Sequence, residues 1–145
     1  MVTQWPLKIL LVHPKAPFFR TSRLTIAADC AVLSNPLFLN RFKSGETVVI
    51  GCPLLEDPDR LMEKLNLILS EAKADQIEVY TMEVPCCHAI HMMVDKAPKA
   101  QSVNHYIVRV VEGAIEEYKP GLIDECMLEA ERKAHEHLCS PSFRG

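Results

Sequence analysis

The chain has 145 residues, of which 48% are hydrophobic and 24% are charged, as in an ordinary globular domain. This length corresponds to one domain that buries roughly 70% of its unfolded surface, which excludes a disordered protein and a small disulfide-dependent scaffold. The formal net charge of −3 lacks the positive excess of a nucleic-acid-binding protein. The unusual feature is the presence of six cysteines.

Several common functional signals are missing from the sequence. No apolar run reaches the ~18–20 residues that a membrane helix requires, and no signal peptide is visible in the first residues, so we expect a cytoplasmic protein. The motifs GxGxxG, GxxxxGK[ST], CxxC, HExxH and GxSxG are all absent. In a reducing compartment, cysteines serve as metal ligands, catalytic thiols or buried packing residues.

The apolar runs predict a parallel sheet with helices between its strands. Continuous apolar segments of this kind are typical of strands covered on both faces, and they occur at residues 9–12, 24–28, 47–50 and 77–82. The clearest helix begins after Asp57, a good N-cap that is followed by Pro58 at the first helical position. Its apolar residues recur at helical spacing: Leu61, Met62, Leu65, Ile68, Leu69 and Ala72.

The remaining segments complete the predicted fold. We expect a short helix between Cys30 and Ser44 closed by Gly45, and a second helix from about residue 85 to Lys96. A hairpin is predicted at residues 105–111 and 114–118, and a helix at 122–138. The sequence thus predicts a single α/β domain over 1–145, with a core at 1–118 and a helical extension at 119–145. Its expected architecture is a Rossmann-like three-layer fold with a mainly parallel sheet of about four strands, plus a C-terminal hairpin and helix.

Four of the six cysteines directly follow predicted strands. Cys30 and Cys52 each follow one strand, and the pair Cys86 and Cys87 follows a third. Parallel strands place their carboxyl ends at one edge of the sheet, where open α/β folds bind ligands. We therefore expect these four cysteines to share a cofactor or metal site, although buried packing cysteines remain an alternative.

Converging thiolates repel one another unless a cation lies between them, which favours an iron–sulfur cluster or a soft metal ion. A [4Fe–4S] cluster held by three cysteines fits three strand ends, and a single ion such as zinc is the alternative. Adjacent helical residues point about 100° apart, so one of Cys86 and Cys87 could be spare.

Acidic and histidine residues near these cysteines are weaker candidates for catalysis or ligation. Asp29 and Glu83 could orient ligands, act as acid or base, or bind the metal, and Asp29 could equally cap a helix. His88 and His91 share a helix face and could complete a Cys/His site, or they are surface or satisfied core histidines. The C-terminal residues Cys126, His135, His137 and Cys139 could form a second metal patch. The alternative is that they belong to a solvated helix face and that Cys139 is a thiol of the C-terminal tail.

Short motifs also suggest a family. The stretches 4–8, 17–18, 26–30 (ending Ala-Asp-Cys), 42–43, 50–53 (Ile-Gly-Cys-Pro) and 82–87 (Met-Glu-Val-Pro-Cys-Cys) resemble a domain found in anaerobic bacteria and archaea. That domain accompanies two-[4Fe–4S] ferredoxin modules in iron–sulfur proteins of poorly defined function. The resemblance covers roughly residues 4–115 and implies an anaerobic redox setting. The ferredoxin module itself is missing here, and His88 and the Leu54-Leu55 pair depart from the family pattern.

These observations predict an iron–sulfur or soft-metal-binding redox protein that uses a ferredoxin-type electron-transfer partner. We expect no nucleic-acid or membrane partner, and a homo-oligomer is possible. A metal-free thiol enzyme is one alternative, with Cys86 or Cys87 as nucleophile and Cys52 or Cys30 as resolving thiol. A non-catalytic docking module for a ferredoxin-type partner is the other.

Overall fold

The computed structural model describes residues 7–83, 85–110 and 112–118. The elements in chain order are η1 (Pro17–Phe19), β1 (Arg20–Ala28), α1 (Asp29–Ser34), α2 (Leu37–Lys43), β2 (Thr47–Gly51), α3 (Pro58–Glu71), β3 (Lys73–Met82), α4 (Pro85–Lys96), β4 (Val103–Val108) and β5 (Ile115–Glu117). None of the helices within these ranges is long and apolar enough to cross a bilayer.

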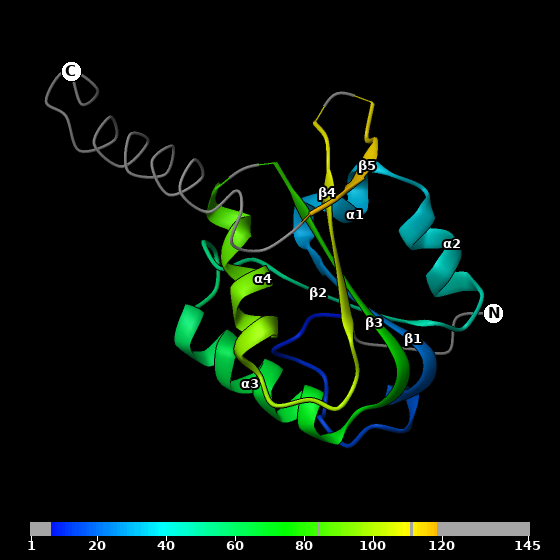
Figure 1. The fold of residues 1–145 in the computed structure, drawn as a ribbon, viewed down its shortest axis with the longest axis vertical. Coiled ribbons are helices and arrows are strands. Elements are labelled where there is room, and N and C mark those ends of the chain that lie inside the picture. The colour runs from blue at the N-terminus through cyan, green and yellow to red at the C-terminus, as the bar shows by residue number, and fades with distance from the viewer. Residues whose placement is uncertain (1–6, 84, 111, 119–145) are drawn as a thin grey trace, which may run out of the picture.

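The five strands form one sheet in the order β2-β1-β3-β4-β5 (Figure 1). Strands β1 to β4 are parallel, and β5 returns antiparallel to β4. The chain leaves β1 for β2 on one side and then passes from β2 to β3 on the other side of β1. The strand order therefore reverses between β1 and β3, which is the switch point of a doubly wound fold.

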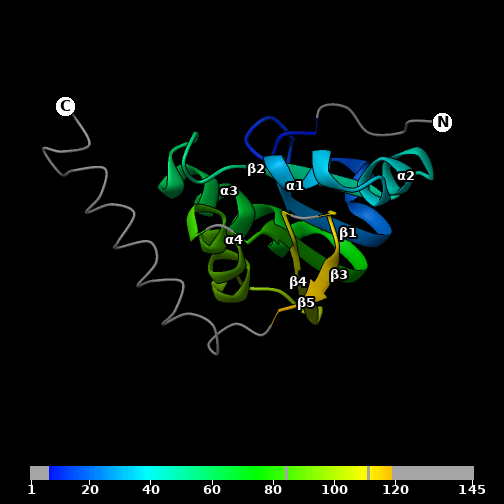
Figure 2. The same ribbon diagram turned by 90° about the horizontal axis from the view of Figure 1, so that it is seen from above.

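Helices cover both faces of this sheet, with α3 and α4 on one side and α1 and α2 on the other (Figure 2). Side-chain contacts agree with this arrangement. His91 of α4 bonds to Thr81 of β3, whereas Arg41 of α2 bonds to Glu78, whose side chain points to the opposite face of the same strand. The Rossmann-like three-layer fold expected from the sequence is thus confirmed, including the hairpin of β4 and β5.

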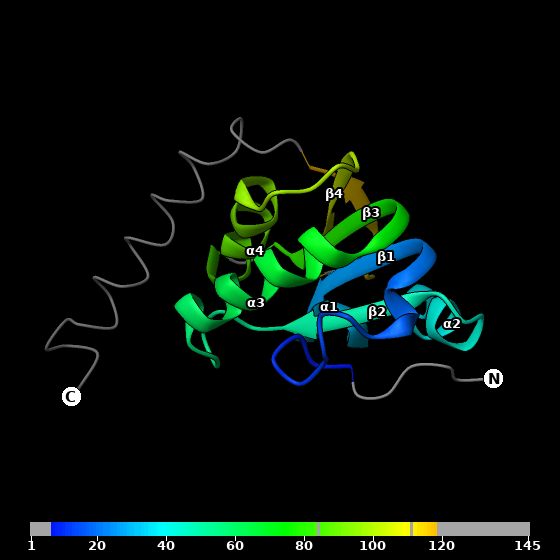
Figure 3. The same ribbon diagram turned by 90° about the horizontal axis from the view of Figure 1, so that it is seen from below.

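Local sequence signals explain the best-defined helix. The Asp57 carboxylate accepts a hydrogen bond from the backbone amide of Asp59 at 2.9 Å, and Pro58 occupies the first turn of α3. Four of the predicted apolar residues are fully buried: Leu61, Leu65, Ile68 and Leu69. They belong to the buried core that α3 shares with the sheet, and Figure 3 shows α3 beside α4 on one face of the sheet.

Two predicted elements differ from the structure. Residues 9–12 form a turn rather than a strand, because the amides of Leu11 and Val12 bond back to the carbonyl of Lys8. Only Lys8 makes a bridge, to Ile50 at the outer edge of β2. Ile9 and Val12 are nevertheless buried, so the apolar run signalled core packing and not a strand. Between Cys30 and Ser44 there are two short helices instead of one, separated where Pro36 follows Asn35.

The predicted helix at 122–138, and with it the Cys126, His135, His137 and Cys139 patch, lies outside the described residues. The division into a core at 1–118 and an extension at 119–145 remains a prediction.

The tip of the β4–β5 hairpin depends on a glycine. Gly113 has a φ of 66° and lies against the backbone carbonyl of Ser34, which an added Cβ would overlap. Its own carbonyl accepts a hydrogen bond from the Asn35 side chain at 2.9 Å. This contact fixes the hairpin against the end of α1, at the same sheet edge as the cysteine-bearing turns.

We expect Gly113→Ala to lower the free energy of unfolding by about 2–4 kcal/mol, because it combines a left-handed backbone with a steric overlap. Urea denaturation measures this loss. Gly45→Ala is the control, since Gly45 also has a positive φ of 88°. Equal losses in the two variants would show that the contact with Ser34 contributes nothing.

Candidate functional site at the carboxyl edge of the sheet

The carboxyl ends of β2, β1 and β3 are neighbours, and each is followed closely by a cysteine, in a loop after β2 and in the first turn of a helix after β1 and β3. Ala28 at the end of β1 pairs with Gly51 at the end of β2, so Cys30 and Cys52 follow adjacent strand ends. Cys30 is exposed and Cys52 is half-buried. Cys86 and Cys87 lie in the first turn of α4, directly after β3. The side chains of Cys86 and Cys87 are outside the described part, so a shared site for all four cysteines remains a prediction.

A lysine that the sequence interpretation did not select joins two of these turns. The Lys8 amino group donates to Asp29 Oδ2 at 2.6 Å and to Glu56 Oε1 at 2.8 Å. The same Glu56 oxygen accepts the backbone amide of Cys52 at 2.9 Å. Asp29 does not cap α1 with its side chain, contrary to one alternative from the sequence, and pairs with Lys8 instead.

This cluster places one positive charge between two carboxylates beside the cysteines. Partial burial acts to lower the pKa of Lys8, but its hydrogen bonds to Asp29 and Glu56 outweigh that effect and raise the pKa. The amine therefore stays charged at neutral pH. It offsets one of the two negative charges that Asp29 and Glu56 bring to the segments after β1 and β2.

We expect Lys8→Met to slow the alkylation of Cys52 by iodoacetamide several-fold at pH 7.5, because two uncompensated carboxylates disfavour the reactive thiolate. Mass spectrometry of peptides after timed labelling measures the rate. Lys15→Met, at an exposed lysine, is the matched control and should react like the natural protein. An unchanged Cys52 rate in Lys8→Met would remove the proposed electrostatic role of Lys8.

The turn after β3 is fastened by Glu83. Its Oε2 accepts from Arg109 at 2.6 Å and its Oε1 accepts from the backbone amide of Val110 at 2.8 Å. Arg109 also donates to Glu116 of the neighbouring strand β5 through its Nε and Nη2. The hydrogen bond from Arg109, assisted by Val110, lowers the pKa of Glu83. Glu83 therefore links the carboxyl ends of β3 and β4, and its carboxylate is engaged in holding the turn that leads to Cys86.

The histidines next to this turn face the interior. His88 and His91 are 6% and 0% exposed, and both contact Tyr118. His91 is hydrogen-bonded to Thr81 and to His105, at 2.8 Å each. His91 thus matches the alternative of a satisfied core histidine. His105 and Tyr118 were not singled out from the sequence, because they are distant from the cysteines along the chain and no motif marks them.

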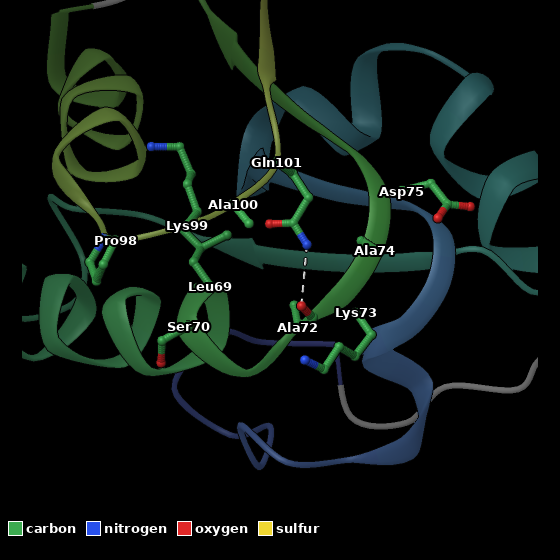
Figure 4. A pocket seen from close by; sticks show the side chains of 10 residues that line it. All are labelled: Leu69, Ser70, Ala72, Lys73, Ala74, Asp75, Pro98, Lys99, Ala100 and Gln101. Carbon is green, nitrogen blue, oxygen red and sulfur yellow. Dashed lines mark hydrogen bonds between the residues drawn. The ribbon is translucent and has the colours of Figure 1, made fainter.

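Two further observations bound the site. Within residues 7–83, 85–110 and 112–118, no group of three or more His, Cys, Asp or Glu side chains is arranged to hold a metal ion. An open cavity of about 570 Å³ lies at the opposite, amino edge of the sheet, between the end of α3, the start of β3 and the loop before β4 (Figure 4). There Gln101 donates to the Ala72 carbonyl at 3.3 Å. No cysteine within the described residues lines this cavity, which lies at the other edge of the sheet from Cys30 and Cys52.

The fold and its edge define a doubly wound α/β protein with its candidate site at the carboxyl ends of the strands. The chain belongs to the Rossmann-like domain family, whose model matches residues 16–142. An uncharacterized protein of Archaeoglobus fulgidus is 56% identical over 138 residues, covering 92% of this chain and 96% of that relative. No solved structure matches the chain.

These comparisons correct the family expected from the sequence. The resemblance to the domain that accompanies two-[4Fe–4S] ferredoxin modules was wrong, because the matching family is the Rossmann-like domain and the Archaeoglobus relative carries no such description. The motifs behind the resemblance are short. Three of them lie where a strand ends, a place at which many α/β folds carry small and polar residues.

Proposed function

We propose that the protein is a redox protein that binds an iron–sulfur cluster, or a single soft metal ion, through cysteines at the carboxyl edge of its sheet. The observation that carries this proposal is the strand order. β1 lies between β2 and β3, and each of the three is followed within a few residues by a cysteine: Cys52 in the loop after β2, Cys30 in the first turn of α1, and Cys86 and Cys87 in the first turn of α4. Neighbouring strands are about 4.8 Å apart, so the outer two of these strands are separated by about 10 Å.

The donor chemistry supports this binding. Cys30 and Cys52 lie at adjacent strand ends and are both accessible to some extent, as ligands of an exchangeable metal must be. Thiolates select iron–sulfur clusters and soft ions over Mg²⁺ or Ca²⁺. Lys8 compensates one of the two carboxylate charges next to these two cysteines, which reduces the repulsion that an anionic thiolate set would meet there. Cys86, Cys87 or both would supply the third ligand from the first turn of α4.

An apolar rim supports a protein partner at this edge. Four exposed apolar side chains lie on segments that follow the strands: Leu33, Leu54, Leu55 and Val110, at 90%, 70%, 80% and 60% exposure. Exposed apolar side chains at one edge of a fold support an interaction there. In the proposal, a ferredoxin-type protein binds there and exchanges electrons, and a reducing compartment such as the cytoplasm keeps the thiols available.

Anaerobic reconstitution tests the proposal. The purified chain is mixed with Fe²⁺ and sulfide under nitrogen and then desalted. A brown protein with broad absorbance near about 400 nm and stoichiometric acid-labile sulfide is the expected result. If the protein remains colourless and also binds no Zn²⁺ or Cd²⁺, while one thiol reacts rapidly with an alkylating agent, the metal proposal fails and the metal-free thiol enzyme takes its place.

A further inference from the structure

The loop after β2 is closed by two hydrogen bonds between its first and last residues. The backbone amide of Cys52 donates to Glu56 Oε1 at 2.9 Å, and the backbone amide of Glu56 donates to the Cys52 carbonyl at 2.9 Å. Residues 52–56 thus form a ring that the Glu56 side chain completes. This side chain is only 13% exposed, so water competes weakly for its hydrogen bonds.

Lys8 holds the Glu56 carboxylate in this position. Its amino group donates to the same Oε1 at 2.8 Å, and one carboxylate oxygen can accept both hydrogen bonds. The backbone of Lys8 pairs with Ile50 at the outer edge of β2, through hydrogen bonds of 2.8 and 3.0 Å that the flanking residues make. Both ends of the contact between Lys8 and Glu56 are therefore anchored beside the strand that leads to Cys52.

The residues on either side of Cys52 also restrict its backbone. Gly51 lies so close to the core that an added Cβ would be 3.0 Å from Ile9 Cδ1 and 3.1 Å from Leu61 Cδ1. Pro53 is buried, and its ring fixes its own φ. Because the amide and the carbonyl of Cys52 are both hydrogen-bonded, χ1 is the main rotation left to move its sulfur.

We propose that Glu56 is a positioning residue for Cys52, which fixes the direction of the cysteine side chain without binding the metal itself. The inference rests on the proposed function, because it assigns Glu56 this role only where Cys52 is a ligand. A ligand whose backbone is held before the metal arrives loses less conformational freedom on binding. Groups that orient metal ligands through hydrogen bonds contribute about 10–100-fold to affinity, and Glu56 makes such a bond to Cys52.

Hydrogen exchange of the Cys52 amide tests the contact without any metal. In the natural protein this amide should exchange slowly with solvent, because it donates to a shielded carboxylate. Glu56→Ala should accelerate the exchange at least ~10-fold, whereas Glu56→Gln, whose amide oxygen still accepts, should stay within ~3-fold. ¹H–¹⁵N NMR measures the rates. The amide of Ile26, in the central strand β1, should be unchanged in both variants and shows that the fold is intact.

Cadmium binding tests the consequence for the site. Glu56→Ala should weaken Cd²⁺ binding about 10–100-fold and reduce the ultraviolet charge-transfer absorption of cadmium–thiolate bonds per bound ion. Glu56→Gln should restore both quantities to within ~3-fold of the natural protein, because it keeps the acceptor for the Cys52 amide and loses only the charge. Glu63→Ala, at an exposed glutamate of α3, is the matched control and should change neither quantity.

The outcomes separate this role from the proposed function. Fast exchange of the Cys52 amide in the natural protein would overturn the role of Glu56. So would a Cd²⁺ affinity of Glu56→Ala within ~3-fold of the natural value, or equal losses in Glu56→Ala and Glu56→Gln. If the natural protein binds no Cd²⁺, the proposed function fails, and the exchange rates alone decide whether Glu56 fixes the backbone of Cys52.

Discussion

Acidification from pH 7 to pH 4 is expected to reduce the free energy of unfolding by about 3 kcal/mol through His91 alone. The imidazole is fully buried between α4, β3 and β4, and burial is the main cause that lowers its pKa from 6.5 to about 3. In the unfolded chain the same group regains an ordinary histidine pKa. Over this pH range His91 therefore binds a proton in the unfolded state but stays neutral in the folded state.

The sign of the effect follows from that difference. Above pH 6.5 the group is neutral in both states, and the stability is fully present. As the pH falls from 6.5 toward 3, the unfolded state is favoured by about 1.4 kcal/mol per pH unit. The interval between pH 6.5 and 4.5 isolates this effect best, because carboxylates such as Glu83, whose pKa is lowered, contribute only in more acidic solution.

Urea denaturation at half-unit pH intervals measures this dependence. His91→Gln is the test variant, since an amide can still donate and accept but does not titrate. The variant should be less stable at pH 7 and should lose much of the slope between pH 6.5 and 4.5. His13→Gln should keep the slope of the natural protein. A slope that stays the same in His91→Gln would contradict the assignment of the titrating group.

Replacement of a proposed ligand is expected to weaken Cd²⁺ or Zn²⁺ binding by more than ~100-fold. Loss of groups that only orient metal ligands costs 10–100-fold in affinity, so loss of a ligand itself should cost more. Cys30→Ser and Cys52→Ser test the two cysteines that the structure places at adjacent strand ends. Competition with a metal chelator under nitrogen measures the affinities.

The two remaining cysteines provide a matched control. Cys126→Ser and Cys139→Ser remove thiols that have no role in the proposed site, and they should leave the affinity within ~3-fold. A uniform loss across all four single variants would indicate nonspecific binding by thiols. Full affinity in Cys30→Ser and Cys52→Ser would contradict the proposed ligand set.

The sequence predicted the strands and helices where periodicity and turn chemistry agreed. The run at 77–82 became the end of β3, and Asp57 with Pro58 began α3 as expected. Residues 9–12 were misjudged because a buried apolar run has the same composition in a turn as in a strand. The apolar run indicates only that Ile9 and Val12 are buried. The hydrogen bonds from Leu11 and Val12 to the Lys8 carbonyl make the segment a turn.

The polar networks could not be predicted from local patterns. Lys8 and Asp29 are 21 residues apart, and Lys8 and Glu56 are 48 apart. Their contact depends on the pairing of Lys8 with Ile50 beside β2. The link between His91 and His105 likewise needs β4 to pair with β3 and α4 to pack over both. Strand order brings these residues together, and strand order is set by the whole domain.

The central claim is that cysteines from three neighbouring strand ends bind one metal, and X-ray absorption spectroscopy tests it most directly. The chain is loaded anaerobically with one equivalent of Zn²⁺, and the first coordination shell is measured. We predict three or more sulfur neighbours at ~2.3 Å. A shell made only of nitrogen and oxygen neighbours at ~2.0–2.1 Å would contradict the claim.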